Sequence, residues 1–298
     1  MDHICVCICT YKRPHLLDRL LESLREQKTG GRFTYSIVIA DNDSQRSAEA
    51  VASAFAASSR VPLQYCMEPR RSVSFTRNRA LENATGNYIA FIDDDEFAPL
   101  RWLLTLYEAC NRDGVAGVMG PVDSYFDQEP PEWVRKGKFY QHSAYPTGTV
   151  VVWTTARTGN VLFKREILPE EEQPFRPQFQ GGGADQDFFR RLMERGHVFV
   201  WSSEAVTYEA VPPVRWKRSF MLRRALLRGY AARLQPTFGG RDLLKSLVAV
   251  PAYLLVLPVA LALGHHRFMA LLVKSCDHLG KVLASVGIRP VKQPYVTE

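Results

Sequence analysis

The sequence predicts an α/β fold in which a mostly parallel sheet is flanked by helices, followed by a C-terminal helical region that associates with a membrane. Two observations support this fold class. Short apolar runs alternate with amphipathic segments in the N-terminal part of the chain, and this order gives strand-helix-strand units and a parallel sheet. Near the C terminus, a basic segment precedes a long stretch without charge. We therefore expect two domains, residues 1–210 and 211–298.

The composition is that of an ordinary folded protein. Of the 298 residues, 46% are hydrophobic and 23% are charged, which excludes a disordered chain. The formal net charge of +7 requires a basic surface, for which nucleic acid, anionic lipid and phosphorylated ligands are candidate partners. The 6 cysteines form no paired framework, which indicates a reducing, cytosolic environment.

Residues 4–9, ICVCIC, are the first continuous apolar run and predict a strand buried on both faces. An amphipathic helix follows, with leucines at helical spacing from residue 16 and an end near residues 29–31. A second buried strand, YSIVIA, ends at Asp41. The alternation continues with a helix at 48–58, a strand at 62–68, a helix at 75–83 and a strand at 88–93.

Polar side chains follow three of these strands. The carboxyl ends of parallel strands lie at one edge of the sheet, where ligands bind in folds of this class. Asp43 and Ser44 fit a helix-capping role equally well. The groups expected at the edge are Thr10, Tyr11 and Arg13 after the first strand, Asp41 to Ser44 after the second, and Asp93, Asp94, Asp95 and Glu96 after the fourth.

The four consecutive acidic residues repel one another and need a cation to neutralise them. Carboxylate oxygens favour Mn²⁺ or Mg²⁺, which bind one or two protein carboxylates together with substrate phosphates. If the strand conformation persists, Asp93 and Asp95 lie on one side and Asp94 and Glu96 on the other, which makes an Asp-x-Asp pair. The implied substrate is a diphosphate.

Six segments occur in an order and spacing that resemble the motif set of the inverting glycosyltransferases of family 2. They are ICTYKRP, VIADNDS, EPRRSVSFTRNRAL, YIAFIDDDE, TGNVLF and GGGADQDFFRRL. The resemblance covers roughly residues 3–235. It implies a Rossmann-like nucleotide-sugar domain, and it implies transfer of a sugar from a nucleotide diphosphate to a hydroxyl group.

The resemblance also assigns donor-binding residues. Thr10, Tyr11 and Arg13 match the segment that lines the nucleotide, and Asp41 matches the acid that bonds the uracil ring. Arg77 belongs to the signature whose arginine approaches the base and the phosphates. These roles agree with the chemistry of the side chains, because a carboxylate accepts a pyrimidine N–H and a guanidinium suits phosphate oxygens.

For the metal, the resemblance points to Asp93 and Asp95, the later of which is the usual metal contact in the family. Asp94, between them, is expected among the donor-binding residues. Asn160, in TGNVLF, matches a segment that lines the acceptor side, and an asparagine after glycine is equally typical of a turn.

The expected general base is Asp185 in GGGADQDFF, with Asp187 as the second candidate. The family usually has Glu-Asp at this point, and this chain has Ala184 in place of the glutamate. The matching base is intact, but a neighbouring acid is missing. Both aspartates also fit a capping role at the N terminus of the following helix.

The positive charge is concentrated after residue 210. Residues 211–245 contain nine basic residues and one acid, a local charge of +8 against +7 for the whole chain. Interleaved apolar residues favour an anionic membrane surface, and without an RNA-recognition motif we expect no nucleic-acid partner. Residues 247–263 carry no charge and fit a tilted span, a re-entrant pair, an in-plane helix or a buried core helix. The membrane-associating region is expected within residues 211–286.

These observations together predict a metal-dependent inverting glycosyltransferase. The expected donor is a nucleotide sugar, UDP-linked by the match of Asp41, and the expected acceptor is a hydroxyl of a lipid-linked or cell-envelope saccharide. The expected location is the cytoplasmic face of a bacterial inner membrane. The alternative is a membrane protein that binds a nucleotide sugar without catalysis.

Overall fold

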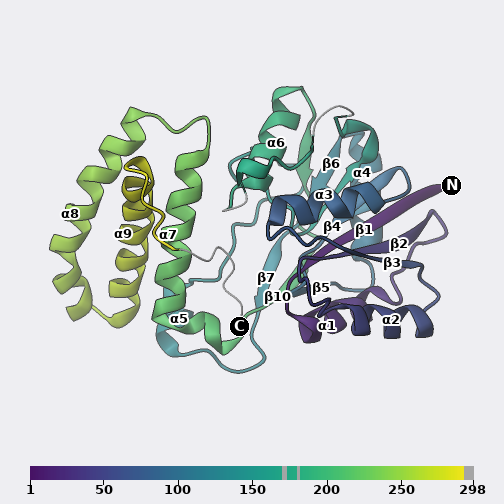
Figure 1. Cartoon of the computed structure of the whole chain (residues 1–298), viewed down its shortest axis with the longest axis horizontal. Coiled ribbons are helices and arrows are strands. Elements are labelled where there is room, and N and C mark those ends of the chain that lie inside the picture. The colour runs from purple at the N-terminus through teal and green to yellow at the C-terminus, as the bar shows by residue number, and fades with distance from the viewer. Residues whose placement is uncertain (170–172, 180–181, 292–298) are drawn as a thin grey trace. The chain divides into compact units, whose positions relative to one another are not determined.

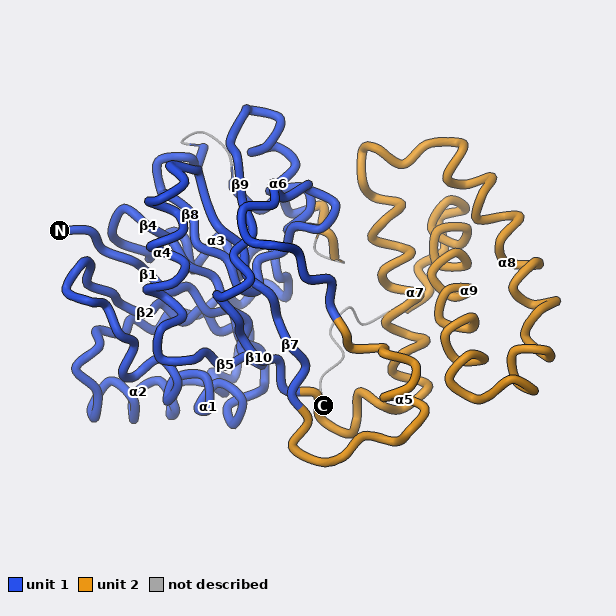
Figure 2. Tube along the Cα trace, turned by 180° about the vertical axis from the view of Figure 1, so that it is seen from behind, with its two compact units in different colours: residues 1–125, 142–177, 184–210 blue, residues 126–141, 178–183, 211–298 orange. Residues whose placement is uncertain are grey.

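The computed structural model describes residues 1–169, 173–179 and 182–291. The chain divides into two compact units (Figures 1 and 2). The first unit contains residues 1–125, 142–177 and 184–210, and the second contains residues 126–141, 178–183 and 211–298. The second unit is thus built from three separate segments of the chain.

A seven-stranded sheet forms the centre of the first unit, in the order β3-β2-β1-β4-β8-β6-β9. Every neighbouring pair is parallel except the two that involve β8, which runs antiparallel to β4 and to β6. The predicted mostly parallel sheet is therefore confirmed. Its strands are β1 (Asp2–Thr10), β2 (Phe33–Asp41), β3 (Leu63–Met67), β4 (Tyr88–Phe91), β6 (Gly117–Met119), β8 (Val161–Lys164) and β9 (Phe199–Trp201).

Helices cover both faces of this sheet (Figure 1). Alternate residues of a strand point to opposite faces, so Val6 and Ile8 of β1 join a core with leucines of α1 and Trp102 of α4. Cys7 points the other way, and its Sγ lies 3.9 Å from the carbonyl oxygen of Ala80 in α3. The helices of this unit are α1 (Pro14–Leu24), α2 (Glu49–Ser58), α3 (Val73–Asn83), α4 (Trp102–Asp113) and α6 (Ala184–Glu194).

A second sheet of three strands lies in the same unit, in the order β5-β10-β7. Strand β10 (Thr207–Ala210) runs antiparallel to β5 (Glu96–Phe97) and parallel to β7 (Val122–Tyr125). The register pairs Glu209 with Glu96. A segment more than a hundred residues further along the chain is thereby placed beside the acidic run.

The second unit is helical. It contains α5 (Glu132–Gly137), α7 (Arg218–Leu234), α8 (Gly240–Ala262) and α9 (His265–Ser285), and α9 packs against both α7 and α8. In the part of the chain that the structure describes, α8 is the one helix that is long and apolar enough to cross a membrane. The uncharged stretch 247–263 lies almost wholly within it, and Pro251 and Pro258 do not end it.

Two expected boundaries are wrong. Helix α1 ends at Leu24 and not near residues 29–31, because the buried side chain of Gln27 donates hydrogen bonds to the carbonyl oxygens of Ser23 (3.0 Å) and Pro99 (2.9 Å). Strand β4 ends at Phe91, two residues before Asp93. There the backbone turns, and the amide of Glu96 donates to the carbonyl oxygen of Asp93 (3.0 Å).

Candidate active site

The carboxyl ends of β1, β2 and β3 meet at one edge of the sheet. The register places Thr10 beside Asp41 and Asp41 beside Met67. Strand β4, on the other side of β1, leads into the acidic run. The sequence therefore placed these strand ends at one edge correctly, and the residues expected after the first, second and fourth strands follow them there.

One arginine serves two of the four acidic residues. The Arg13 Nη1 donates to Oδ1 of Asp94 (3.1 Å) and to Oδ2 of Asp95 (3.2 Å). The Thr10 hydroxyl donates to Oδ2 of Asp94 (2.8 Å). Two predicted residues from the β1 end, Thr10 and Arg13, thus hold the acidic loop, and Arg13 neutralises part of the repulsion within it.

The expected alternation along the acidic run is wrong. It required an extended chain through Asp93 to Glu96, but the chain turns after β4. Asp94 and Asp95, expected on opposite sides, both reach the same guanidinium group. Glu96 belongs to β5 and accepts a hydrogen bond from the hydroxyl of Thr207 (2.9 Å).

The other half of the run is short of positive charge. Burial, and then the charge of Asp95, raise the pKa of Asp93 to about 7, although Arg77 opposes this shift. Burial and the charge of Asp93 raise the pKa of Glu96 well above its usual value. Both directions mean that the ionised carboxylates are destabilised in this place, which a bound cation would reverse.

These carboxylates lie close against the backbone of Gly159, where a side chain would not fit. A Cβ at this position would lie 2.6 Å from Oε1 of Glu96 and 3.1 Å from Oδ2 of Asp93. Over residues 1–169, 173–179 and 182–291, no three His, Cys, Asp or Glu side chains are arranged as a complete metal site. Oxygen ligands from one or two aspartates, completed by substrate phosphates, nevertheless fit Mn²⁺ or Mg²⁺.

His142 links Glu209, the neighbour of Glu96 in the second sheet, to a further cation. Its Nδ1 lies 2.9 Å from Nη1 of Arg157, and its Nε2 lies 3.0 Å from Oε2 of Glu209. An arginine can only donate, so Nδ1 accepts and the proton of the neutral ring is on Nε2, which donates to Glu209. No motif in the sequence indicated these three residues.

Asp41 is buried and already engaged by the protein. Its carboxylate accepts hydrogen bonds from the amides of Asp43 (2.9 Å) and Ala48 (3.0 Å) and from the hydroxyl of Tyr65 (2.9 Å). A carboxylate has about four acceptor positions, so about one is left for a ligand. Asp41 therefore stabilises the turn between β2 and α2 through these hydrogen bonds.

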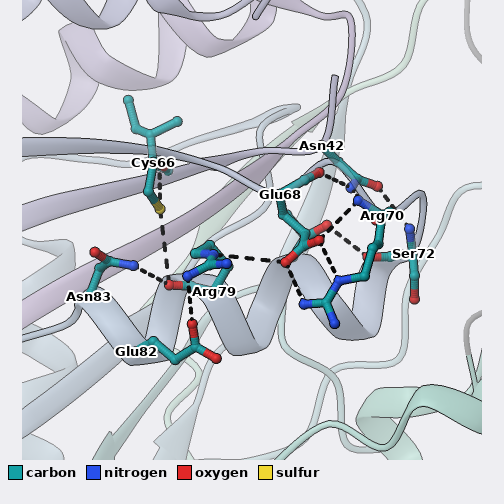
Figure 3. Close-up of polar contacts among 10 residues, drawn as sticks. Asn42, Cys66, Glu68, Arg70, Ser72, Arg79, Glu82 and Asn83 are labelled. Atoms are coloured by element: carbon teal, nitrogen blue, oxygen red, sulfur yellow. Dashed lines mark hydrogen bonds and ion pairs between the residues drawn. The ribbon is translucent and has the colours of Figure 1, made fainter. Parts of the chain in front are cut away.

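A polar cluster that the sequence analysis missed fixes the loop after β3 (Figure 3). The Asn42 amide donates to the carbonyl oxygens of Glu68 and Arg70, each at 2.7 Å, and its Oδ1 accepts from the amide of Ser72 (3.0 Å). Glu68, 1% exposed, accepts two hydrogen bonds of 2.8 Å from the Arg70 guanidinium. These hydrogen bonds, above all those from Arg70, lower the pKa of Glu68.

The same loop contacts a predicted donor-side residue. The guanidinium of Arg71 lies 5.0 Å from the ring centre of Tyr11, a cation-π arrangement. Because Asn42 and Glu68 hold the residues on both sides of Arg71, the cluster sets the position of that guanidinium relative to Tyr11.

Arg77 and Asn78 have different roles. The charge of Arg77 acts on Asp93, and its guanidinium lies 5.4 Å from the ring centre of Phe175. Asn78, 4% exposed, donates to the carbonyl oxygen of Phe175 (2.8 Å) and accepts from its amide (2.9 Å). The Phe175 ring stacks on Phe188 of α6 with centroids 4.5 Å apart. Asn78 therefore connects α3 to the helix that carries the expected base.

The two candidate bases on α6 have different surroundings. Asp187 is 0% exposed, and its oxygens accept hydrogen bonds from Arg190 (2.9 Å) and Arg191 (3.0 Å). Asp185 is only partly buried in the first turn, where its Oδ1 accepts from the amide of Gln186 (3.0 Å). Among the described residues, no hydrogen bond or ion pair joins Asp185 to the acidic run.

Asn160 is a structural residue of a turn. It has a positive φ of 58° and no exposed surface. Its side chain donates to the carbonyl oxygens of Pro121 (2.7 Å) and Ala205 (2.6 Å) and accepts from the indole of Trp102 (2.8 Å). The turn interpretation of this residue is the one that the structure supports.

Comparisons with known proteins identify the family of this chain. A family model described as Glycosyl transferase family 2 matches residues 5–170. The chain is 32% identical over 228 residues to the succinoglycan biosynthesis protein ExoM of Rhizobium meliloti (strain 1021), which covers 76% of this chain and 73% of that protein.

Two solved structures share the fold. One is the mannosyltransferase PcManGT from Pyrobaculum calidifontis in complex with GDP-Man and Mn²⁺, with a TM-score of 0.64, 18% identity and coverage of 95% of this chain and 88% of that one. The other is S. aureus TarS 1–349 in complex with UDP, with a TM-score of 0.55, 14% identity and coverage of 96% and 91%. The chain spans 55% of a longer S. aureus TarS structure.

The family model covers more than half of the chain, and the bacterial relative is similar over about three quarters of it. The mostly parallel sheet is consistent with both findings. This chain belongs to glycosyltransferase family 2 and is a glycosyltransferase.

Proposed function

We propose that this enzyme transfers a sugar from a nucleotide diphosphate, UDP-linked, to a hydroxyl of a lipid-linked or cell-envelope saccharide, with inversion at the anomeric carbon. The observation that carries the proposal is the acidic run after β4, where Asp93 and Glu96 have raised pKa values and lie close against the backbone of Gly159. The name of the ExoM relative supports an exopolysaccharide product, and the titles of the two structures support a nucleotide-sugar donor.

In the donor half of the site, Tyr11, Arg71 and Arg77 bind the nucleotide. Asp41 orients the turn between β2 and α2, which lies beside the nucleobase. Asp93 and Asp95 would hold Mn²⁺ or Mg²⁺. When bound, such an ion withdraws charge from the departing diphosphate. Arg13 keeps Asp94 and Asp95 in place before the donor arrives, because its Nη1 bonds both carboxylates.

On the acceptor side, Asp185 takes the proton of the attacking hydroxyl onto a carboxylate oxygen. Asp187 is unsuited to this role because two guanidinium groups occupy its oxygens. We assign Asp187 to the positioning of α6. Its partner Arg191 also donates to the carbonyl oxygen of Pro174, next to Phe175.

The membrane is part of this proposal. The exposed apolar surface of α8 and the basic residues of 211–245 support association with the cytoplasmic face of a bacterial inner membrane, where lipid-linked saccharides are built. This location also fits the six cysteines, which are free thiols in the structure.

The direct test is a donor screen with the purified full-length chain. We expect release of the nucleotide diphosphate from one donor, in the presence of Mn²⁺ and membrane-lipid extract, and loss of release in EDTA. A chain that binds a nucleotide sugar but releases nothing with any donor or extract would instead be a binding protein.

Asn78→Ala tests the connection between α3 and α6. We expect kcat to fall about tenfold or more, since a misplaced base is costly, and we expect the KM for the donor to change little. Two hydrogen bonds to buried backbone groups are lost, so the free energy of unfolding should fall by about 2–3 kcal/mol. Steady-state kinetics and thermal unfolding measure these effects.

Asn83→Ala is the matched control for that variant, since Asn83 lies in the last turn of α3 and bonds the exposed Gln64 (2.7 Å). It should leave kcat unchanged. A variant Asn78→Ala with normal kcat would contradict the proposed connection even if its stability were reduced.

Glu68→Gln tests the loop after β3. We expect the KM for the donor to rise about 3- to 10-fold with kcat nearly unchanged, because the loop that places Arg71 loses its charged hydrogen bonds. Because its pKa is lowered, ionised Glu68 stabilises the fold at pH values above the usual pKa of a glutamate. This stabilisation is lost as the pH falls through the lowered pKa of Glu68. The difference in melting temperature from wild type should therefore be largest at pH 7 and decrease as the pH falls below the usual pKa of a glutamate.

Glu82→Gln provides the comparison, because Glu82 belongs to the same cluster but its side chain is 55% exposed (Figure 3). It should leave the KM for the donor unchanged. Equal KM values for wild type and Glu68→Gln would remove this loop from the donor site.

A further inference from the structure

Helix α8 presents a continuous apolar face to solvent. Leu255, the most exposed of these residues, is 81% exposed, and Val248 is 62% exposed. Arg241 and Lys245 lie on the same side, because residues 241, 245, 248, 252, 255 and 259 follow one another at the spacing of one helix face. The other exposed apolar residues of this helix and its C-terminal end are Leu244, Leu247, Leu254, Val256, Val259, Leu261 and Leu263.

The opposite side of α8 is tied to α9. Ser246 is buried and its Oγ lies 3.0 Å from Nδ1 of His278. The rings of Tyr253 and His278 are 5.9 Å apart. Helix α8 is therefore one side of a packed hairpin and not an isolated segment (Figure 1).

Helix α9 is in turn locked against α7. A Cβ on Gly229 would lie 2.0 Å from the carbonyl oxygen of Asp277, and a Cβ on Gly280 would lie 2.3 Å from that of Leu226, so the two backbones touch. Beside this crossing, the Arg228 guanidinium makes two contacts, of 3.1 Å and 3.0 Å, with the Asp277 carboxylate. The three helices thus form one layer with α9 in the middle.

This layer is incompatible with a membrane-spanning α8. The helix itself is long enough, since 23 residues extend about 34 Å. However, α9 would enter the bilayer with α8 and would carry Lys274, Asp277 and Lys281 into it. Helix α7, which packs against α9, would add its five arginines. Burial of each of these charges in a bilayer is unfavourable. The sum of these costs exceeds what the apolar face of one helix supplies.

We propose that α8 lies in the plane of the membrane, with its apolar face in the interface of an anionic bilayer and with Arg241 and Lys245 at the phosphate headgroups. This inference rests on the proposed membrane location and chooses among the arrangements that the sequence left open. The occupant of the face is lipid because basic side chains continue the apolar stripe, and an anionic surface attracts each of them. The enzyme is then held on one side of the membrane without crossing it.

The orientation is tested by thiol labelling from outside sealed vesicles of phosphatidylcholine and phosphatidylglycerol, with the purified full-length chain added to them. Arg241→Cys and Arg267→Cys place thiols near the two ends of α8, at exposed residues. We expect a membrane-impermeant maleimide to label both variants above the wild-type background without detergent. Labelling of Arg267→Cys only after detergent would show a spanning helix and overturn the proposal.

The surface is tested by Leu255→Asp. This variant should fold, because the residue is 81% exposed, and it should lose cosedimentation with the anionic vesicles at least tenfold. Val198→Asp, at an exposed apolar residue of the first unit, is the control and should bind normally. Wild type should bind at least tenfold less to vesicles of phosphatidylcholine alone.

Two further outcomes would overturn the proposal. If a second copy covers α8, wild type is a dimer in solution and Leu255→Asp is a monomer that still binds vesicles. If neither vesicle binds wild type, the face does not dock on lipid. None of these measurements uses a sugar donor, so they can fail while glycosyl transfer is confirmed, or succeed while it is not.

Discussion

Replacement of Asp185 by asparagine should lower kcat by about 10²–10⁴-fold, the usual contribution of a general base. Asparagine keeps the shape of the side chain and can still accept from the amide of Gln186, so α6 should begin at the same residue. What is lost is the ability to take a proton from the acceptor hydroxyl. The affinity for the donor should remain within about twofold of wild type, because that loss affects the transition state alone.

The measurement combines steady-state kinetics with calorimetric titration of the unreactive nucleotide diphosphate. Glu194→Gln is the matched control, since it makes the same chemical change in the last turn of the same helix, at a side chain that is 59% exposed. It should leave kcat unchanged. Normal turnover in Asp185→Asn would remove Asp185 as the base and return the role to another group.

Asp93→Asn should have two opposite effects. Its activity with Mn²⁺ should fall by about 10²-fold or more, because a charged metal ligand is lost and stabilisation of the leaving diphosphate decreases by several kcal/mol. Its metal-free stability at pH 8 should instead rise, by on the order of 1 kcal/mol, because a destabilised charge is removed. Loss of function combined with gain of stability distinguishes a functional carboxylate from a structural one.

The gain in stability of Asp93→Asn over wild type should depend on pH in a defined direction. Burial and Asp95 raise the pKa of Asp93 to about 7, so the folded chain holds this proton more tightly than the unfolded chain does. The penalty for ionisation is therefore absent near pH 3, grows as the pH rises and is complete above about pH 7. Thermal unfolding in EDTA at pH 4 and pH 8 measures it, with Asp18→Asn as the control at an exposed aspartate of α1.

Addition of Mn²⁺ should remove the stability advantage of Asp93→Asn over wild type, because a metal that binds only the folded wild type stabilises the wild type. A variant that is less stable than wild type at pH 8 in EDTA would contradict the account of the acidic run. It would mean that Asp93 makes a favourable contact in the metal-free protein.

The sequence predicted the strands and their ends where the pattern involved neighbouring residues only. Apolar runs such as ICVCIC predicted the parallel strands, and the strand ends located the edge with Thr10, Asp41 and the acidic run. The periodicity argument failed at Asp93, because strand alternation holds only while the chain is extended, and a backbone turn is not visible in a run of identical residue types.

Contacts between distant parts of the chain were not predictable in this way. The hydrogen bonds of His142 join it to Arg157 and Glu209, which lie in other segments of the chain. None of these three residues belongs to a recognisable motif. Asn42 resembled an ordinary polar loop residue, but its amide fixes a loop 26 to 30 residues further along. Satisfaction of buried polar groups depends on the three-dimensional arrangement, which pattern and propensity do not encode.

The pair of hydrogen bonds between Asn78 and Phe175 has a consequence for the order of assembly. The two residues are 97 positions apart, and contacts at such a separation must overcome the entropy of closing a long loop. The pairing of β1 with β2 and of β2 with β3 joins segments much closer along the chain, so we expect these strands to form before α6 reaches its place. A chain with these strands paired can therefore still lack an ordered Asp185.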